Sequence, residues 1–264
     1  MITHRIYYVL IVSFFGINLA YSQMATAKVE YLCTTKTAYT EMSGKNTLYF
    51  NPSFGLYEHS DFPKETNYSQ QGGSISYQRV DEEGLPVFTD LEQGIQTWKL
   101  IYLRSLGPVI FQDTIADCHW EIKSGTKQIG PFICQQASGK FGGRQYDAWF
   151  TPEIPVPLGP YKLGGLPGLI LEAVSRDGMV EYAFVKYDPT PDEDYSLRPP
   201  GEGTKMTWEK FERKIINDLL RVESLSTADY TITHTNPPPN WHIEKDLITI
   251  IREYKQQRER KKNE

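Results

Sequence analysis

Short runs of strand-forming residues, each ended by turn residues, recur along most of the chain and constrain its fold more than any other feature. The runs are rich in β-branched and aromatic residues, which suit a pleated, half-buried surface. No helical pattern lies between successive runs, which disfavours parallel strand–helix–strand units, so we predict a mainly β fold with an antiparallel sheet. The predicted strands are residues 27–37, 47–50, 54–59, 74–79, 86–91, 97–104, 109–115, 118–123, 129–137, 144–150, 169–174 and 179–187.

Turn residues between neighbouring runs predict three hairpins. Their turns lie at residues 81–84, 124–126 and 176–178. The last contains Asp177-Gly178 between two apolar runs, which is among the stronger short-range hairpin signals. Residues 60–73 are polar and contain a Gly pair, so we predict a loop there.

The C-terminal part changes character. Residues 188–203 form a Pro-rich linker, and residues 207–221 have the apolar spacing of an amphipathic helix that packs on the sheet. Thr207 is placed to cap that helix. Residues 236–264 combine an Asn-Pro-Pro-Pro break with a charged C-terminal helix. We therefore predict one β-rich domain over residues 23–235, with one or two packed C-terminal helices.

The first 22 residues predict export. His4 and Arg5 precede an uncharged, largely apolar stretch, and Ala20-Tyr21-Ser22 places small residues where signal peptidase cleaves. The apolar stretch is short for a membrane span, and nothing later in the sequence is long and apolar enough to form one. We expect the mature chain in the periplasm, at the outer membrane or secreted. The formal net charge of −5 argues against binding nucleic acid.

A Pro-rich stretch interrupts the strands at residues 151–168. Each Pro lacks an N–H group, so this stretch is neither a central strand nor the inside of a helix. We predict a long, stiff loop, with Pro167-Gly168 in a type II turn and Leu166, Leu169 and Ile170 anchored in the core. Such a loop suits either a functional site or a structural lid on a curved sheet.

The end of this loop resembles a known family. Residues 165–170 read Gly-Leu-Pro-Gly-Leu-Ile, the signature for which the GLPGLI family is named. The resemblance extends over residues 29–187, but Asn236 is followed by three Pro where the family often has an Asn-Pro-Ile-like tail. Further matching residues are Trp120, Ile129, Cys134, Ala137, Phe141, Gly143, Arg144, Ala148, Trp149, Phe150, Thr151, Ile154, Pro155, Gly159 and Pro160.

This resemblance implies an exported protein of bacteria with an outer membrane, and it implies no established activity. The strand order is also similar to the curved, open half-barrel of lipoprotein carriers, a likeness of fold that carries little functional weight. The expected fold is therefore a curved antiparallel sheet or open half-barrel.

Aromatic residues gather around the Pro-rich stretch and predict a binding site. Aromatics at one mouth of a curved sheet would form an apolar groove, the usual form of a ligand site, although they also suit an ordinary core. The predicted binding residues are Arg144, Tyr146, Trp149, Phe150, Pro155, Gly159, Pro160, Tyr161, Gly165, Leu166, Pro167 and Gly168.

The three cysteines predict a disulfide rather than a metal site. A hairpin that turns near Thr126 would place Cys118 opposite Cys134, leaving Cys33 over, and an oxidising compartment favours pairing. Cys118 and His119 are neighbours on a predicted strand, so their side chains point to opposite faces and do not share a metal ion easily. We predict no metal and no cofactor.

No catalytic motif is evident, and no Gly-X-Ser-X-Gly nucleophile elbow is present. The expected function is therefore non-enzymatic: an envelope protein that binds a hydrophobic ligand or an envelope protein partner. The alternative is an envelope hydrolase that uses Asp147 or Glu153, which flank the Pro-rich stretch, or His119.

Overall fold

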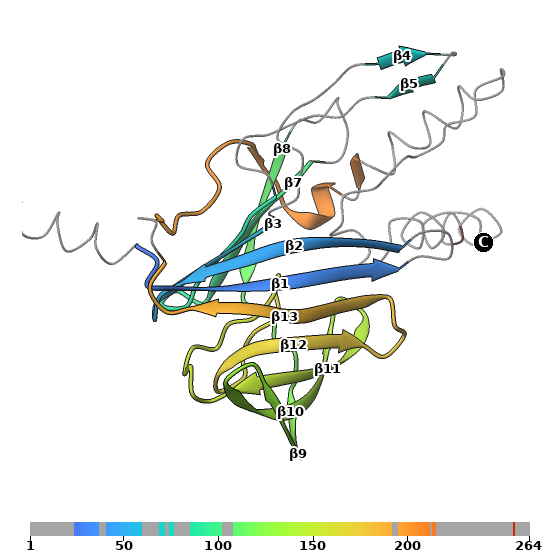
Figure 1. Ribbon diagram of the computed structural model, residues 1–264. Helices are drawn as coiled ribbons and strands as arrows, with labels where there is room; N and C mark the ends of the chain where they lie inside the picture. The colour runs from blue at the N-terminus through green and yellow to red at the C-terminus, as the bar shows by residue number, and fades with distance from the viewer. Residues whose placement is uncertain are drawn as a thin grey trace, which may run out of the picture.

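The computed structural model describes residues 24–36, 41–59, 69–71, 74–76, 85–101, 108–191, 195–211, 213–214 and 256. Within this part of the chain, twelve strands form one open sheet and two more form a separate hairpin (Figure 1). The strands are β1 (Ala27–Lys36), β2 (Glu41–Phe50), β3 (Phe54–His59), β4 (Ser69–Gln71), β5 (Ser74–Ser76), β6 (Val87–Asp90), β7 (Ile95–Ile101), β8 (Pro108–Thr114), β9 (Glu121–Ile129), β10 (Phe132–Phe141), β11 (Arg144–Thr151), β12 (Leu169–Ser175), β13 (Val180–Asp188) and β14 (Thr204–Lys205).

The sheet is built from two meanders that meet in its middle. Its order is β14-β8-β7-β6-β3-β2-β1-β13-β12-β11-β10-β9. From β1 the chain winds outward to β8, continues at the opposite edge with β9, and winds inward to β13 beside β1. Every described pairing is antiparallel except that of the short β14 with β8. The predicted mainly β, open antiparallel fold is confirmed.

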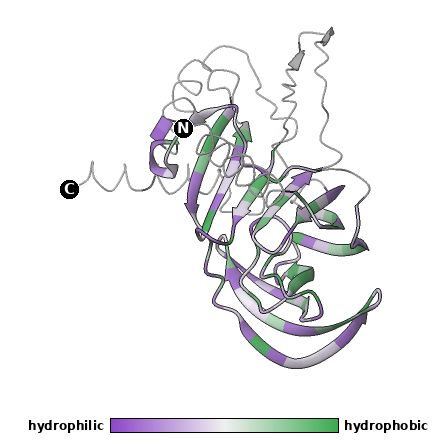
Figure 2. Cartoon of the chain, turned by 90° about the vertical axis from the view of Figure 1, so that its left-hand side faces the viewer, coloured by the Kyte–Doolittle hydropathy of each residue, from purple (hydrophilic) through white to green (hydrophobic). Residues whose placement is uncertain are grey.

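One face of the sheet is buried because apolar residues alternate with polar ones along its strands (Figure 2). In β1, Val29, Tyr31 and Cys33 are buried, whereas Leu32 between them is exposed. The main core lies on this buried face and includes residues of β1, β2, β3, β10, β11, β12 and β13. The other face of the same strands is open to solvent and carries most of their charged residues.

Two of the three predicted hairpins are wrong, and the third is confirmed. β12 and β13 pair as predicted around the turn at residues 176–178, where Gly178 has a φ of 70°. The first predicted hairpin is wrong because β5 pairs with β4, whereas β6 pairs with β3 and β7. Its predicted turn at residues 81–84 lies outside the described residues. Part of the predicted loop at residues 60–73 is the strand β4, and most of that loop lies outside the described residues.

The predicted hairpin at residues 124–126 is wrong because β9 runs straight through them. The turn lies instead at Gly130, whose φ is 55°, and Ile129 faces Phe132 across it. Gly125 lies inside β9 beside the flexible end of the Gln136 side chain and has no positive φ. A glycine inside a strand thus has the same sequence signal as a turn glycine.

The predicted Cys118–Cys134 disulfide is also wrong, because it depended on the hairpin turn at residues 124–126. Cys134 faces Lys127 in the actual register, and Cys118 lies before β9 begins. Cys118, Cys134 and Cys33 are all buried free thiols. Burial raises the pKa of Cys118 and of Cys134 to about 11, which keeps both thiols protonated at neutral pH.

A short helix closes the described part of the C-terminal region. It begins after Thr207, whose hydroxyl accepts a hydrogen bond from the amide of Lys210 at 3.4 Å, as the predicted cap requires. Phe211 packs edge-on against Phe111 of β8, with their ring centres 5.0 Å apart. The predicted signal peptide, the end of the predicted helix and nearly all of residues 236–264 lie outside the described residues. Where the chain is described, no helix has the length and apolar character to cross a membrane.

Candidate functional site

Residues 152–168, which we call the motif loop, cover the buried face of the sheet between β11 and β12. Its apolar side chains point into the main core rather than forming a rim. Backbone hydrogen bonds join the loop to the start of β12: Leu169 donates to Ile154 at 3.0 Å, and Ile170 donates to Leu158 at 2.9 Å. The buried apolar residues of the loop are Ile154, Val156, Leu158, Tyr161, Leu163 and Leu166.

The motif glycines permit close backbone contacts inside the loop. A Cβ at Gly168 would lie 2.1 Å from the carbonyl oxygen of Thr151, which no side chain could tolerate without a backbone shift. Gly165, by contrast, has a φ of 88° and open space around its Cβ position. The predicted type II turn at Pro167-Gly168 is therefore wrong, because the positive φ belongs to Gly165.

Contacts from both halves of the sheet hold the motif loop in place. Trp120 donates from Nε1 to the carbonyl oxygen of Gly164 at 2.7 Å. Lys162 is only 4% exposed, and its Nζ lies 3.4 Å from the ring centre of Trp98 on β7. Such a cation–π contact helps to stabilise a buried ammonium group. Sequence reasoning missed the Lys162–Trp98 contact, since the spacing of these residues predicts no contact.

The predicted binding residues divide between the two faces of the sheet and the loop surface. Tyr146, Phe150, Gly159, Pro160, Tyr161, Leu166 and Gly168 are buried, Arg144 and Trp149 are half-buried, and Pro155, Gly165 and Pro167 are exposed. Phe141 connects two of the buried aromatics, with its ring centre 6.5 Å from that of Tyr146 and 6.3 Å from that of Tyr161. Trp149, one residue from the buried Phe150, lies on the opposite face of β11.

The exposed side of β10, β11 and β12 gathers charged, aromatic and apolar groups into a surface that we call the strand patch. In one row across the sheet, Ser138 faces Asp147, which faces Val174. In the next row, Gln136 faces Trp149, which faces Glu172. The patch also includes the long side chains of Lys127 and Arg176, which reach these rows from β9 and from the turn after β12.

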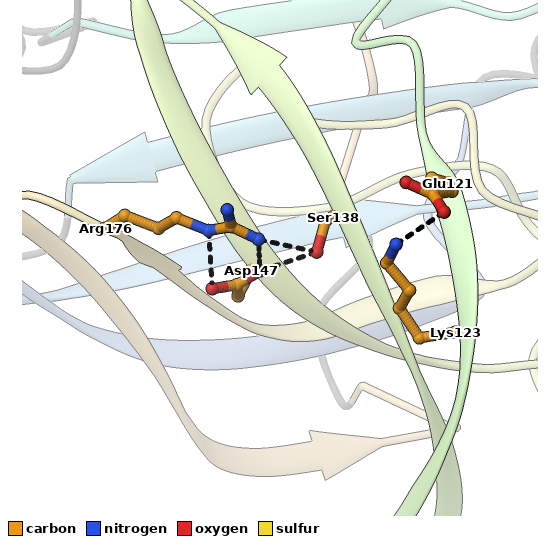
Figure 3. Close-up of polar contacts among 5 residues, drawn as sticks. All are labelled: Glu121, Lys123, Ser138, Asp147 and Arg176. Carbon is orange, nitrogen blue, oxygen red and sulfur yellow. Dashed lines mark hydrogen bonds and ion pairs between the residues drawn. The ribbon is translucent and has the colours of Figure 1, made fainter.

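Asp147 is held by a network of hydrogen bonds in one row of the strand patch (Figure 3). Arg176 donates to both carboxylate oxygens of Asp147, from Nε at 3.0 Å and from Nη2 at 2.9 Å. Ser138 donates to the same carboxylate at 2.6 Å. The Arg176 hydrogen bonds, together with that of Ser138, lower the pKa of Asp147, so it is ionised at neutral pH. Glu121 and Lys123 form a separate ion pair nearby on β9.

Trp149 occupies the other row and is covered in part by a cation. The Nζ of Lys127 lies 4.6 Å from the Trp149 ring centre and also forms an ion pair with Glu172. Lys127 thus contacts an aromatic face and a carboxylate together, which orders all three side chains on the surface. Contacts within the chain therefore hold this row of the strand patch in place.

The three candidate catalytic residues have different partners and do not form one site. His119 is exposed, with a φ of 47°, and its Nδ1 lies 2.9 Å from a carboxylate oxygen of Asp117. Glu153 accepts a hydrogen bond from the amide of Ile133 at 2.8 Å. Asp147 is engaged by Arg176 in the strand patch. Among the residues that the structure describes, no three His, Cys, Asp or Glu side chains gather as metal ligands would.

Comparisons with known proteins connect this region to a family without a known activity. Residues 143–172 match Porph_ging, described as a protein of unknown function. This segment contains the Gly165–Ile170 signature, the motif loop and three residues of the strand patch, Asp147, Trp149 and Glu172. The search of curated proteins finds no significant match.

One solved protein shares the fold at low sequence identity. PNGF-II, solved in two crystal forms, superposes with a TM-score of 0.51 and 14% identity over 72% of this chain. That match spans about a third of the PNGF-II chain, 33% and 32% in the two structures. An uncharacterised conserved protein from Thermus thermophilus has a TM-score of 0.35 and 11% identity, over 72% of this chain and 96% of its own.

Proposed function

We propose that this chain is an exported cell-envelope protein that works by binding, and that it holds another envelope protein on its strand patch. The observation that carries the proposal is Trp149, which is partly exposed on the strand patch among ordered charges. Trp and Arg are the residues that most often dominate the binding energy of protein interfaces.

The surroundings of Trp149 support a protein partner. Val174 in the adjacent row is 39% exposed, and Leu32 on the same face of β1 is 43% exposed. Exposed apolar side chains on the same face as Trp149 and Arg176 match the mixed composition of interface cores and rims. Because Asp147 and Glu172 already have cationic partners, the patch favours a partner with apolar and aromatic groups over a highly charged one.

The buried face argues against a hydrophobic ligand in the predicted groove. The place expected for that ligand holds the motif loop itself, including Leu158, Leu163 and Leu166. A ligand would have to displace these side chains, and each fully buried Leu contributes roughly 1.5–3 kcal/mol to folding. A protein on the strand patch displaces only solvent.

The hydrolase alternative has less support. A general acid needs a carboxyl group that holds its proton near neutral pH, and the Arg176 contact lowers the pKa of Asp147 instead. Glu153 and His119 make contacts with other partners, so neither is joined to Asp147 in an acid–base pair. The arrangement matches structural ion pairing.

The proposal that the chain is exported is based on the sequence of residues 1–22, and cell fractionation can test it. We expect the chain outside the cytoplasm, with its N-terminus at Gln23 when the mature protein is sequenced. An uncleaved N-terminus in the cytoplasmic fraction would refute the proposed compartment.

Site-specific photo-cross-linking tests the strand patch. A benzophenone amino acid replaces Val174, and a matched control replaces Gln112, which is exposed on β8 at the other end of the sheet order. Irradiation of living cells of the source organism should join one envelope protein to position 174 and not to position 112. Trp149→Ala should reduce that adduct at least fivefold while circular dichroism stays unchanged.

Each other outcome contradicts the proposal. An adduct of twice the mass of this chain would show self-association instead. Equal adducts at positions 174 and 112, or an adduct insensitive to Trp149→Ala, would show contact by chance rather than a binding surface.

A further inference from the structure

Cys118 and Cys134 lie far apart along the β9–β10 hairpin. The carbonyl oxygen of Cys118 accepts a hydrogen bond from the amide of Lys140 at 2.7 Å, which places Cys118 beside the end of β10. Cys134 lies six residues before Lys140 on the same strand, near the turn at Gly130. Six strand residues span roughly 20 Å, whereas the Cα atoms of a disulfide lie within about 7 Å. A Cys118–Cys134 disulfide is therefore incompatible with this fold.

The sequence of the same segment also suits a second hairpin, whose turn lies at residues 124–126. These residues form a turn sequence between two strand-forming runs, and a hairpin centred on Thr126 places Cys118 opposite Cys134. In the fold, Cys134 faces Lys127 instead, which comes nine residues after Cys118 in the chain. An odd shift of register exchanges the two faces of a strand. The two hairpins therefore exclude each other.

Spacing along the chain favours this pair of cysteines before the protein folds. Cys118 and Cys134 are 16 residues apart, whereas Cys33 lies 85 and 101 residues away from them. Because the entropic cost of closing a loop rises with the logarithm of its length, the short loop closes about tenfold more readily than either long one. An unfolded chain that meets an oxidant should therefore join Cys118 to Cys134 first.

Folding then removes all three thiols from the reach of an oxidant. Cys33 is 4% exposed, Cys118 is 2% exposed and Cys134 is 0% exposed. Burial raises the pKa of Cys33 to about 12 and the pKa of the other two thiols to about 11. The thiolate is the reactive form of cysteine, so the folded protein offers little of it at neutral pH. The thiols are thus open to oxidation in the unfolded chain and protected in the folded one.

We infer that the β9–β10 segment is a redox-sensitive element of this fold, in which a Cys118–Cys134 disulfide formed before folding fixes the second hairpin and blocks the native sheet. The strand patch would be lost as well, because Lys127 would leave its place beside Trp149 and Glu172. The chain reaches its fold only when both thiols stay reduced until β9 and β10 have paired. The inference concerns folding, and it needs the proposed export only because compartments outside the cytoplasm supply oxidants.

The reaction is a thiol–disulfide exchange, here written with oxidised glutathione as the oxidant. One cysteine gives its proton to solvent, and its thiolate attacks the glutathione disulfide, breaks the S–S bond and releases one glutathione. The second cysteine, deprotonated in the same way, displaces the other glutathione and closes the protein disulfide. The two protein thiols thus lose two electrons and two protons, and the glutathione disulfide becomes two thiols. A dithiol such as dithiothreitol reverses both steps.

Refolding of the full chain tests this inference. The denatured protein, dilute enough to prevent bonds between chains, is treated with oxidised glutathione and then freed of it. Its mass should fall by about 2 Da, the two hydrogens lost with one disulfide, and tryptic peptides that contain Cys118 and Cys134 should be joined. After removal of the denaturant, the oxidised chain should contain at least tenfold fewer native molecules than the reduced chain, as judged by the urea transition. Dithiothreitol should restore them.

Cysteine variants identify which bond blocks folding. Cys118→Ala and Cys134→Ala each remove the pair, so both should refold at least fivefold better than the wild type after the same oxidation. Cys33→Ala is the matched control, because it keeps the pair and should still be blocked. The folded wild-type protein should keep its mass in oxidised glutathione. The wild-type comparison with and without dithiothreitol needs no substitution, so it decides the question even where an alanine variant does not fold.

Three outcomes would overturn the inference. An oxidised chain that keeps its mass loss and still shows the native urea transition would prove that the disulfide and the fold are compatible. Oxidation of the folded protein as fast as that of the denatured one would show that burial protects nothing. Refolding of Cys33→Ala as complete as that of Cys118→Ala would assign the blocking bond to Cys33.

Discussion

Acidification should destabilise this protein through His59. Burial lowers the pKa of His59 from an ordinary 6.5 to about 4 in the folded chain, whereas the unfolded chain keeps the ordinary value. Between these two values the unfolded state binds more protons, so stability falls as the pH falls. The contribution of neutral His59 is complete above pH 6.5 and is lost on the way to pH 4.

The magnitude follows from the size of the shift. One pKa unit corresponds to about 1.4 kcal/mol, so the change from 6.5 to about 4 corresponds to about 3 kcal/mol of unfolding free energy at full protonation. The slope should approach about 1.4 kcal/mol per pH unit near pH 5. Asp147 and Asp177 have lowered pKa values, so they add a loss of stability only as their unfolded forms protonate, near pH 4 and below.

Urea unfolding followed by tryptophan fluorescence at pH 7, 6 and 5 measures this slope. His59→Gln should flatten it, because no imidazole is then left to titrate at that position. His119→Gln is the matched control, since His119 is exposed, and it should keep the slope of the wild-type protein. Equal slopes in the wild type and His59→Gln between pH 7 and 5 would refute the argument from burial.

Two further substitutions test how the motif loop is held. Gly168→Ala should destabilise the protein by about 3 kcal/mol or more, because its Cβ would meet the Thr151 oxygen, whereas Gly165→Ala should lose only about 1 kcal/mol from its positive φ. Equal losses in urea unfolding would contradict this distinction. Tyr31→Phe should lose about 1–3 kcal/mol, because the Ile170 carbonyl is left buried without that donor. A Tyr31→Phe variant as stable as the wild type would show that this hydrogen bond contributes little.

Local sequence patterns were sufficient for the fold class and for many strand positions. The alternation in β1 and the strand β3 could be predicted because each depends on side chains within the strand. The β12–β13 hairpin could be predicted because Asp177-Gly178 supplies its own turn geometry. These features involve neighbours in the chain, and neighbours are what a sequence displays.

The glycines show where local patterns stopped being informative. Gly125 and Gly130 both separate strand-forming runs in the sequence, but only Gly130 makes a turn, whereas Gly125 lies inside β9. Gly168 and Gly165 also have different roles: a Cβ at Gly168 would meet the carbonyl oxygen of Thr151, whereas Gly165 has a positive φ and open space around it. Glycine serves both positive φ and close approach, and only distant residues reveal which applies. The Cys118–Cys134 disulfide was predicted wrongly because the hairpin turn was expected near Gly125, whereas it lies at Gly130.

Trp149 and Tyr161 show the same limit of local sequence patterns. Trp149 and Tyr161 were predicted as members of one aromatic groove, since the sequence places them in one segment. Side chains alternate between the two faces of a strand, and Trp149 of β11 lies on the exposed face. Tyr161 of the motif loop lies in the core, where its ring contacts that of Tyr57. That this segment is aromatic, stiff and flanked by strands follows from its residues alone. Which face each aromatic occupies depends on strand register and on residues far away in the chain, so it emerges only in the folded protein.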